Sequence, residues 1–258
     1  MLRSLVKIAL FTLTLTKLAG GACDLPDYTF YLKVGSGAAV SELATVRAPY
    51  PPWYPALQGY NAKLGVSPII SFGVGCELAQ LLDLELNIAN RATFKYRKHQ
   101  TPTIGSDAYT REFDLNITSV LIAANLLGLG VPALNWEVGG GRLYQVLGVG
   151  LGVSDLLITN FRTTGLPATG DSAPYASFST ENQYTRRRNF TYTLLTGLEY
   201  NYQNCWVLGS GYRYFNAGNF SGPQYLRTGS GGAVDVGAAT WQIPFRANEW
   251  FIEFKLFI

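Results

Sequence analysis

The sequence predicts an all-β fold, namely an eight-stranded antiparallel transmembrane β-barrel preceded by a cleavable N-terminal signal helix. Three observations carry this prediction. Aromatic residues and glycine are abundant, at 14% and 28 residues, while charged residues are scarce, at 14%. The apolar residues recur with a period of two over long segments, and short and long connections alternate between those segments.

The first 22 residues have the plan of a secretory signal peptide. The basic start MLRSLVK is followed by the apolar stretch IALFTLTLT and the small residues of KLAGGA. We therefore predict a signal peptide over 1–22 and a barrel domain over 23–258. Cleavage after Ala22 would leave Cys23 first, where lipid modification is an alternative, although Gly20 stands where a lipoprotein signal has a leucine-like residue.

Removal of this segment also changes the charge balance. The charged side chains of residues 1–22 are Arg3, Lys7 and Lys17, so cleavage takes the net charge from +3 to 0. The basic pI of the precursor is therefore no argument for a nucleic-acid partner. The three cysteines, Cys23, Cys76 and Cys205, give no disulfide framework.

The period of two is plainest in LDLELNIANRATFKY. Leu82, Leu84, Leu86 and Ile88 lie on one face, and the other face carries Asp83, Glu85, Asn87, Arg91, Thr93 and Lys95. This strand is fifteen residues long, whereas strands of soluble sheets have about five or six. Seven further segments show the same pattern: 27–40, 69–78, 111–121, 143–154, 189–200, 206–215 and 249–258. In segment 111–121, Phe113, Leu115 and Ile117 are expected on the outer face and Glu112 on the inner face.

The connections favour a membrane barrel over a soluble one. Those at 79–81 and 201–205 are short and 126–141 is intermediate, whereas 41–65, 97–107, 155–187 and 217–246 are long. A soluble β-sandwich or lipocalin-like barrel would have an apolar inside and a polar outside, which alternation alone does not distinguish. Strand length, predicted export and aromatic residues near the strand ends favour an apolar outside; these aromatic residues are Tyr28, Tyr96, Tyr109, Tyr200, Trp206, Tyr214 and Trp250.

Charged residues on the inner face predict a buried network. The lumen of an eight-stranded barrel is just wide enough for side chains, and an unpaired buried charge is costly. We expect ion pairs centred on Arg213, with Glu253 as its main partner. The other expected members are Lys33, Glu85, Arg91, Glu112, Glu199 and Lys255. Such a network either fills and closes the barrel or gates a narrow pore.

Little in the sequence suggests catalysis. The single histidine, His99, is expected on an exposed loop, and neither a catalytic triad nor a metal site is indicated. We expect no cofactor. Segment 48–60, rich in Pro, Trp and Tyr, suits a binding surface. Arg186, Arg187 and Arg188 are expected just above the membrane, where they would either contact lipopolysaccharide phosphates or remain solvated.

Four segments resemble a known family. GYRYFNAGNF at 211–220, FRANEWFIEFKLFI at 245–258, LYQVLGVGLGVS at 143–154 and LLTGLEYNYQNCWVLGSGYRYF at 194–215 are similar to the small opacity-protein-like and OmpA-like outer-membrane β-barrels of Gram-negative bacteria. The resemblance implies that the final apolar stripe is the signal read by the barrel-assembly machinery; its residues are Trp250, Ile252, Phe254, Leu256 and Ile258. The family usually ends in Phe, whereas here Phe257 is penultimate.

The last strand is expected to pair with the first, around Tyr28 to Val34, and so to close the barrel. The sequence thus favours a non-enzymatic outer-membrane protein with a structural, adhesive or host-contact role carried by long extracellular loops. Its expected partners are outer-membrane lipid, lipopolysaccharide and host surface molecules. A small pore or a conduit for hydrophobic ligands is the alternative, and a lipid-modifying barrel enzyme is third.

Overall fold

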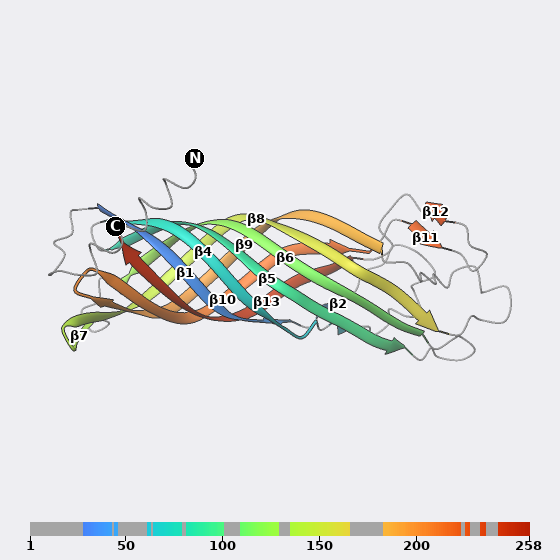
Figure 1. Cartoon of the computed structure of the whole chain (residues 1–258), viewed down its shortest axis with the longest axis horizontal. Coiled ribbons are helices and arrows are strands. Elements are labelled where there is room, and N and C mark those ends of the chain that lie inside the picture. The colour runs from blue at the N-terminus through green and yellow to red at the C-terminus, as the bar shows by residue number, and fades with distance from the viewer. Residues whose placement is uncertain are drawn as a thin grey trace, which may run out of the picture.

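Eight long antiparallel strands close into a single barrel (Figure 1). The computed structural model describes residues 28–42, 44–45, 61–62, 64–78, 81–100, 109–128, 135–165, 183–222, 225–227, 233–235 and 242–258. The barrel strands are β1 (Tyr28–Ser41), β4 (Val66–Leu78), β5 (Leu82–Gln100), β6 (Tyr109–Leu127), β8 (Gly141–Gly165), β9 (Gln183–Tyr202), β10 (Trp206–Ser221) and β13 (Gln242–Phe257). The predicted closed all-β barrel is therefore confirmed.

Each barrel strand pairs with its neighbours along the chain, and β13 pairs with β1. This closing register places Lys33 opposite Lys255 and Val34 opposite Phe254, as the sequence predicted for the last strand. Strand β7 (Asn135–Val138) forms a hairpin with the start of β8. The remaining short strands form two hairpins: β2 (Ala44–Thr45) with β3 (Asn61–Ala62), and β11 (Tyr225–Arg227) with β12 (Ala233–Asp235).

The two ends of the barrel differ. The C-terminus and the β7 hairpin lie at the left end in Figure 1, which we call the short-turn end. The other ends of the barrel strands, at Ser41, Val66, Gln100, Tyr109, Gly165, Gln183, Ser221 and Gln242, form the opposite end, which we call the long-loop end. The strands reach further toward the long-loop end than predicted, since β8 continues to Gly165 and β9 begins at Gln183. Among the described residues, no helix is long and apolar enough to cross a membrane.

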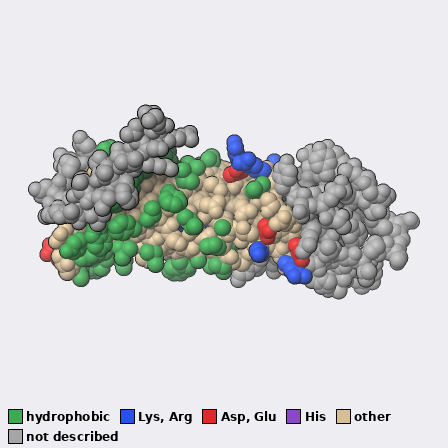
Figure 2. All heavy atoms as spheres, viewed as in Figure 1, with side chains coloured by type: hydrophobic (Ala, Val, Ile, Leu, Met, Phe, Trp, Pro, Cys, Tyr) green, Lys and Arg blue, Asp and Glu red, His purple; other side chains and the backbone are tan. Residues whose placement is uncertain are grey.

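The outer face is apolar in the half nearer the short-turn end (Figure 2). Ile122 is 69% exposed and Trp250 62% exposed, and apolar residues of every barrel strand accompany them. The inner face in this half is polar, with Lys33, Asp83, Glu85 and other charged residues buried. This half therefore has the inverted arrangement that distinguishes it from a soluble barrel.

Aromatic clusters mark both edges of this apolar band. Near the short-turn end, the Trp206 ring packs on Tyr202 and Phe254, with ring centroids 5.2 Å and 6.0 Å away. Toward the long-loop end, Tyr212 packs on Trp250 at 5.3 Å. Further toward the same end, Tyr192 packs on Tyr214 at 6.2 Å. Trp206 and Tyr214 are eight residues apart along β10, which corresponds to about 20 Å, given a rise of ~3.3 Å and a tilt of ~40°.

The half nearer the long-loop end has the opposite arrangement. Phe113, Leu115 and Ile117 point inward and are buried, so their predicted outward orientation was wrong. They belong to an apolar interior cluster with members on all eight barrel strands except β9, including Phe94, Phe215, Phe220 and Phe245. Here the barrel follows the rule for proteins in water, with apolar side chains inside.

A β-bulge changes the inner face of β5 between the two halves. The register with β6 shifts between Arg91 and Phe94, and Thr93 has a φ of 40°. As a result, Phe94 and Tyr96 point inward, whereas Lys95 is exposed. The expected inward orientation of Thr93 and Lys95 and the placement of Tyr96 in an outer aromatic belt were therefore wrong, because the extra residue reverses the alternation.

Candidate functional site

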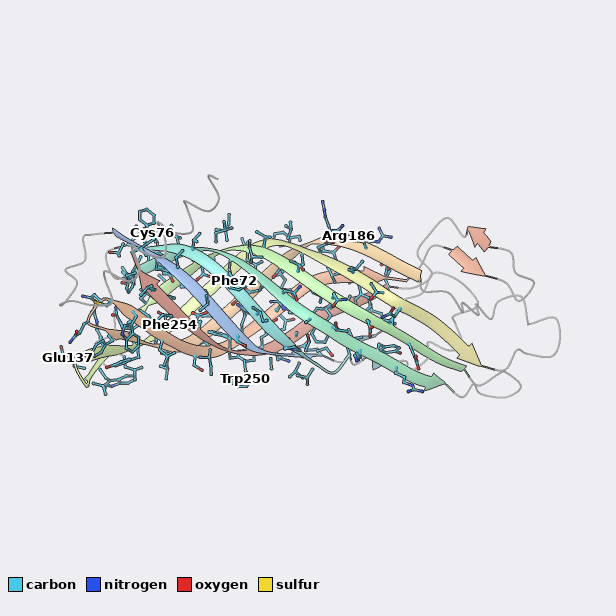
Figure 3. All side chains as sticks on the ribbon, in the orientation of Figure 1. Phe72, Cys76, Glu137, Arg186, Trp250 and Phe254 are labelled. Carbon is cyan, nitrogen blue, oxygen red and sulfur yellow. The ribbon has the colours of Figure 1, made fainter. Side chains whose placement is uncertain are left out.

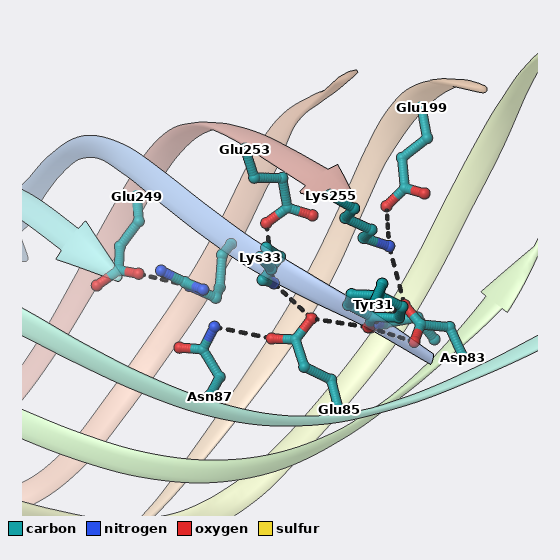
Figure 4. A network of polar contacts seen from close by, with 11 residues as sticks. Tyr31, Lys33, Asp83, Glu85, Asn87, Glu199, Glu249, Glu253 and Lys255 are labelled. Atoms are coloured by element: carbon teal, nitrogen blue, oxygen red, sulfur yellow. Dashed lines mark hydrogen bonds and ion pairs between the residues drawn. The ribbon is translucent and has the colours of Figure 1, made fainter. Parts of the chain in front are cut away.

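Two lysines bind four carboxylates in the part of the lumen nearer the short-turn end (Figure 4). Lys33 Nζ, on β1, lies 2.6 Å from Glu85 Oε2 and 3.0 Å from Glu253 Oε2. Lys255 Nζ, on β13, lies 2.9 Å from Asp83 Oδ2 and 2.7 Å from Glu199 Oε1. We call these six residues the lysine layer. Their side chains are at most 7% exposed, and they join β1, β5, β9 and β13 across the barrel.

Neutral donors complete the lysine layer. The Tyr31 hydroxyl donates to Asp83 and, at 3.2 Å, to Glu85 Oε2, so it links the two ion-pair groups. Tyr144 donates to Glu199 Oε2 at 3.2 Å, and Asn87 donates to Glu85 Oε1 at 2.7 Å. Buried carboxylates are tolerated only when their oxygens are satisfied in this way.

A second charged group, the arginine layer, lies next to it. Glu249, on β13, binds both Arg91 and Arg213, with 2.6 Å between Arg213 Nε and Glu249 Oε2. Arg91 also donates to Ser119 Oγ at 2.9 Å, and its guanidinium carbon lies 3.5 Å from the centroid of the Phe215 ring. The Glu249 carboxylate thus binds two buried guanidiniums, next to the apolar interior cluster of the half nearer the long-loop end.

The expected network needs two corrections. Arg213 pairs with Glu249 and not with Glu253, because the β10–β13 register places Arg213 directly opposite Glu249. Glu112 is not in the lumen: it pairs with Arg97, whose side chain is 78% exposed, at 2.9 Å. The other expected members, Lys33, Glu85, Arg91, Glu199, Glu253 and Lys255, are buried in the two layers.

Sequence reasoning left several participants out of the network, among them Asp83, Glu249 and Tyr31. Asp83 lies on the polar face of its strand, two residues before Glu85, and Glu249 lies four residues before Glu253, so the same period of two could have found both. Tyr31 lies two residues before Lys33 and shares its face, but its contact with Asp83 depends on the space above Gly75, which the pattern does not reveal. A Cβ atom on Gly75 would lie 2.2 Å from the Tyr31 hydroxyl oxygen.

Apolar side chains close the lumen on both sides of the charged layers. Toward the short-turn end, Tyr31, Val207 and Phe257 form a buried cluster, with the rings of Tyr31 and Phe257 6.1 Å apart. Toward the long-loop end, Phe94 and Phe245 pack at 5.0 Å, and Phe113 and Phe220 at 5.9 Å. Within the described residues, the two charged layers therefore fill the lumen between two apolar clusters.

The arginine triplet lies on β9 and not on a loop, and Arg186, Arg187 and Arg188 are all exposed. In Figure 3, Phe72, Trp250 and Phe254 project from the apolar band, and Arg186 lies beyond them toward the long-loop end. Arg186 Nε donates to both carboxylate oxygens of Asp155 at 2.8 Å. This hydrogen bonding lowers the pKa of Asp155 below its ordinary value.

The other predicted sites have simpler outcomes. His99 belongs to β5, opposite Thr110, and not to a loop. The stripe Trp250, Ile252, Phe254, Leu256 and Ile258 faces outward along β13. In the part of the chain that the structure describes, no disulfide joins Cys76 and Cys205, and no three side chains are arranged to hold a metal ion. Residues 1–22, Cys23 and segment 48–60 lie outside the described residues.

Comparisons with known proteins give structural neighbours but no sequence relatives. No family model and no curated protein matches the chain. Three of the similar solved structures are Neisserial surface protein A, OprG from Pseudomonas aeruginosa and the attachment invasion locus protein Ail of Yersinia pestis. Neisserial surface protein A is 12% identical, covers 90% of this chain and 99% of its own, and has a TM-score of 0.44. OprG is 9% identical, covers 89% of this chain and 96% of its own, and has a TM-score of 0.40. Ail is 13% identical, covers 89% of this chain and 99% of its own, and has a TM-score of 0.36. With TM-scores below 0.5, the fold assignment rests on the strand pairing and not on these similarities.

Proposed function

We propose that the chain is an outer-membrane protein whose half nearer the short-turn end spans the bilayer. The support is the apolar outer band, which has aromatic clusters at both edges and a polar interior behind it. Its height of about 20 Å is close to the ~25 Å band of bacterial outer-membrane barrels. The short turns would then face the periplasm, and the long-loop end would face outward. Export by the predicted signal peptide at 1–22 belongs to this proposal.

Its role is structural or one of surface interaction, without catalysis. The observation that carries this is the filled lumen, in which the lysine and arginine layers lie between two apolar clusters. A barrel braced in this way is a rigid support for its connections, and binding residues are commonly carried on such loops. The connections at the long-loop end would contact host surface molecules.

Two surface features have roles in this proposal. The outward stripe of β13 is the signal for the barrel-assembly machinery, and the arginine triplet contacts lipopolysaccharide phosphates. Arg186 is held by Asp155, and Arg188 lies directly opposite Asp155 in the β8–β9 register, so three guanidiniums accompany one carboxylate. Such a surplus of arginine suits a phosphate-bearing partner.

The test of the surface role uses segment 48–60. We expect cells that display Trp53→Ala with Tyr54→Ala to lose binding to host cells or extracellular matrix, and cells that display Gln58→Ala to keep it. The heat-dependent shift of the folded barrel on gels verifies equal display. Equal binding by both variants would contradict a role for this segment.

Planar-bilayer recording tests the filled lumen, and we expect no stable unit conductance from the wild-type protein. A steady conductance would favour the small pore. A conduit for apolar ligands remains the second candidate because one part of the barrel wall, between β9 and β10, is not closed by backbone pairing.

A further inference from the structure

One buried carboxylate of the lumen belongs to neither charged layer. Glu77, on β4, is 7% exposed, and no hydrogen bond or ion pair of the described residues reaches its carboxylate. Of the cations around it, Lys255 acts on it most strongly and Arg142 less so, but Asp83 and Glu199 already bind Lys255 (Figure 4). A buried carboxylate without a bound cation or a donor is costly. Glu77 therefore needs a partner that the described side chains do not provide.

The side chain next to Glu77 on β1 also lacks a partner. Thr29 lies directly opposite Glu77 in the β1–β4 ladder, and both side chains are on the inner face. Residues directly opposite each other have Cβ atoms about 5 Å apart, so the Thr29 hydroxyl lies beside the Glu77 carboxylate. Thr29 is 6% exposed, and its buried Oγ1 atom has no hydrogen-bond partner among the described residues. Two adjacent strands thus place unpaired oxygen atoms side by side in the lumen.

The next two positions across the sheet bound this site. Asp83 lies opposite Glu77 in the β4–β5 ladder, and Asn125 lies opposite Asp83 in the β5–β6 ladder. Donors already occupy both carboxylate oxygens of Asp83. Asn125 Oδ1 is unpaired too, but a Cβ atom on Gly148 would lie 2.0 Å from it, so this oxygen points toward β8 and away from Glu77. The oxygen atoms left for a partner at this site are therefore those of Glu77 and Thr29.

The lysine layer does not supply the missing positive charge. It holds four carboxylates against two ammonium groups, and Glu77 adds a fifth carboxylate beside it. Moving Lys255 toward Glu77 would lengthen its contact with Asp83 or Glu199, so one buried acid would lose what another gained. The fold therefore leaves an excess of buried negative charge at this end of the lumen.

We propose that Glu77 and Thr29 form a binding site for a monovalent alkali cation, such as sodium, at the short-turn end of the lumen. Hard cations take oxygen ligands, and a single positive charge balances the one carboxylate that lacks a partner. In the described part of the chain, no trio of acids lies together for a divalent ion. Glu77 is the penultimate residue of β4 and keeps slight exposure, so water at that end can complete the coordination.

The test compares the urea midpoint of the folded barrel in sodium chloride with that in N-methyl-D-glucamine chloride at equal ionic strength. The organic cation screens exposed charges equally but is too large for the site. Glu77→Gln removes the carboxylate charge and keeps the side-chain shape, and Thr29→Val removes the hydroxyl alone. Glu137→Gln is the matched control, because Glu137 is an exposed acid at the same end of the barrel (Figure 3).

We expect a higher urea midpoint for the wild type in sodium chloride, because a cation that binds only the folded barrel stabilises it. Glu137→Gln should keep this sodium effect, Thr29→Val should reduce it, and Glu77→Gln should abolish it. The wild type, and not Glu77→Gln, should also broaden the sodium-23 NMR signal.

Equal midpoints of the wild type in the two salts would overturn the cation site, since a proton on Glu77 would then satisfy the carboxylate. A full sodium effect in Glu77→Gln would overturn it as well, because sodium would then bind elsewhere. Either result leaves the surface role of the loops untouched.

Discussion

At the scale of single residues, Glu249 is the most consequential side chain of the interior. It is the shared carboxylate of Arg91 and Arg213, and it is fully buried. Each lysine of the lysine layer, in contrast, has two carboxylate partners. If one carboxylate of the lysine layer is removed, the lysine keeps a second carboxylate partner. If Glu249 is removed, both Arg91 and Arg213 lose their shared carboxylate partner.

Glu249→Gln should lower the free energy of unfolding by about 3–5 kcal/mol, the usual cost of leaving buried charges without a partner. Glu253→Gln should cost clearly less, because Lys33 keeps Glu85 at 2.6 Å. Urea unfolding in lipid vesicles, followed by the gel shift of the folded barrel, measures both. Equal losses for the two variants would argue against the separate role of Glu249.

Asp155 supplies a pH-dependent contact outside the apolar band. Because Arg186 lowers the pKa of Asp155 in the folded state, this contact stabilises the protein above the unfolded pKa, near 3.8, and is lost as the pH falls through the lower folded value. NMR titration of the carboxyl carbon should give a pKa below 3.8 in the wild type and a return toward that value in Arg186→Gln. An unchanged pKa in the variant would disprove the contact.

At the scale of elements, β-bulges determine which side chains face the lumen in the half of the barrel nearer the long-loop end. Asn116 Oδ1 accepts from both the amide and the hydroxyl of Thr93, each at 2.9 Å, and so fixes the bulge of β5. A second irregularity brings Asn160 Nδ2, on β8, within 2.6 Å of Asp114 Oδ2. Polar side chains on the outer face therefore hold the conformations that direct Phe94 and Tyr96 inward.

Asn116→Ala should destabilise the barrel by about 1–3 kcal/mol, since two hydrogen bonds to the Thr93 bulge are lost. Asn90→Ala is the control on the neighbouring strand, because Asn90 makes one exposed hydrogen bond to Thr118 at 2.9 Å, and it should cost less than ~1 kcal/mol. The same urea unfolding measures both variants. A cost for Asn116→Ala no larger than that for Asn90→Ala would show that Asn116 does not support the bulge.

At the scale of the whole molecule, two environments divide one continuous sheet. The alternation of apolar and polar residues predicted the eight strands and the buried charges of the half nearer the short-turn end, because it marks which side chains share a face. It failed for Phe113, Leu115 and Ile117, because alternation does not say which face is inside. The reversal after Thr93 and the partner choice of Arg213 depend on a bulge and on strand register, which a single sequence does not specify.

The most direct test of the central claim, that only the half nearer the short-turn end lies in lipid, uses two positions on the outer face of β6. Spin labels at Ile122→Cys and Asp114→Cys lie eight residues apart on that strand. In bilayers, we expect oxygen to relax the Ile122→Cys label and a water-soluble nickel complex to relax the Asp114→Cys label. If the nickel complex relaxes both labels equally, the apolar band does not lie in the membrane and the account is wrong.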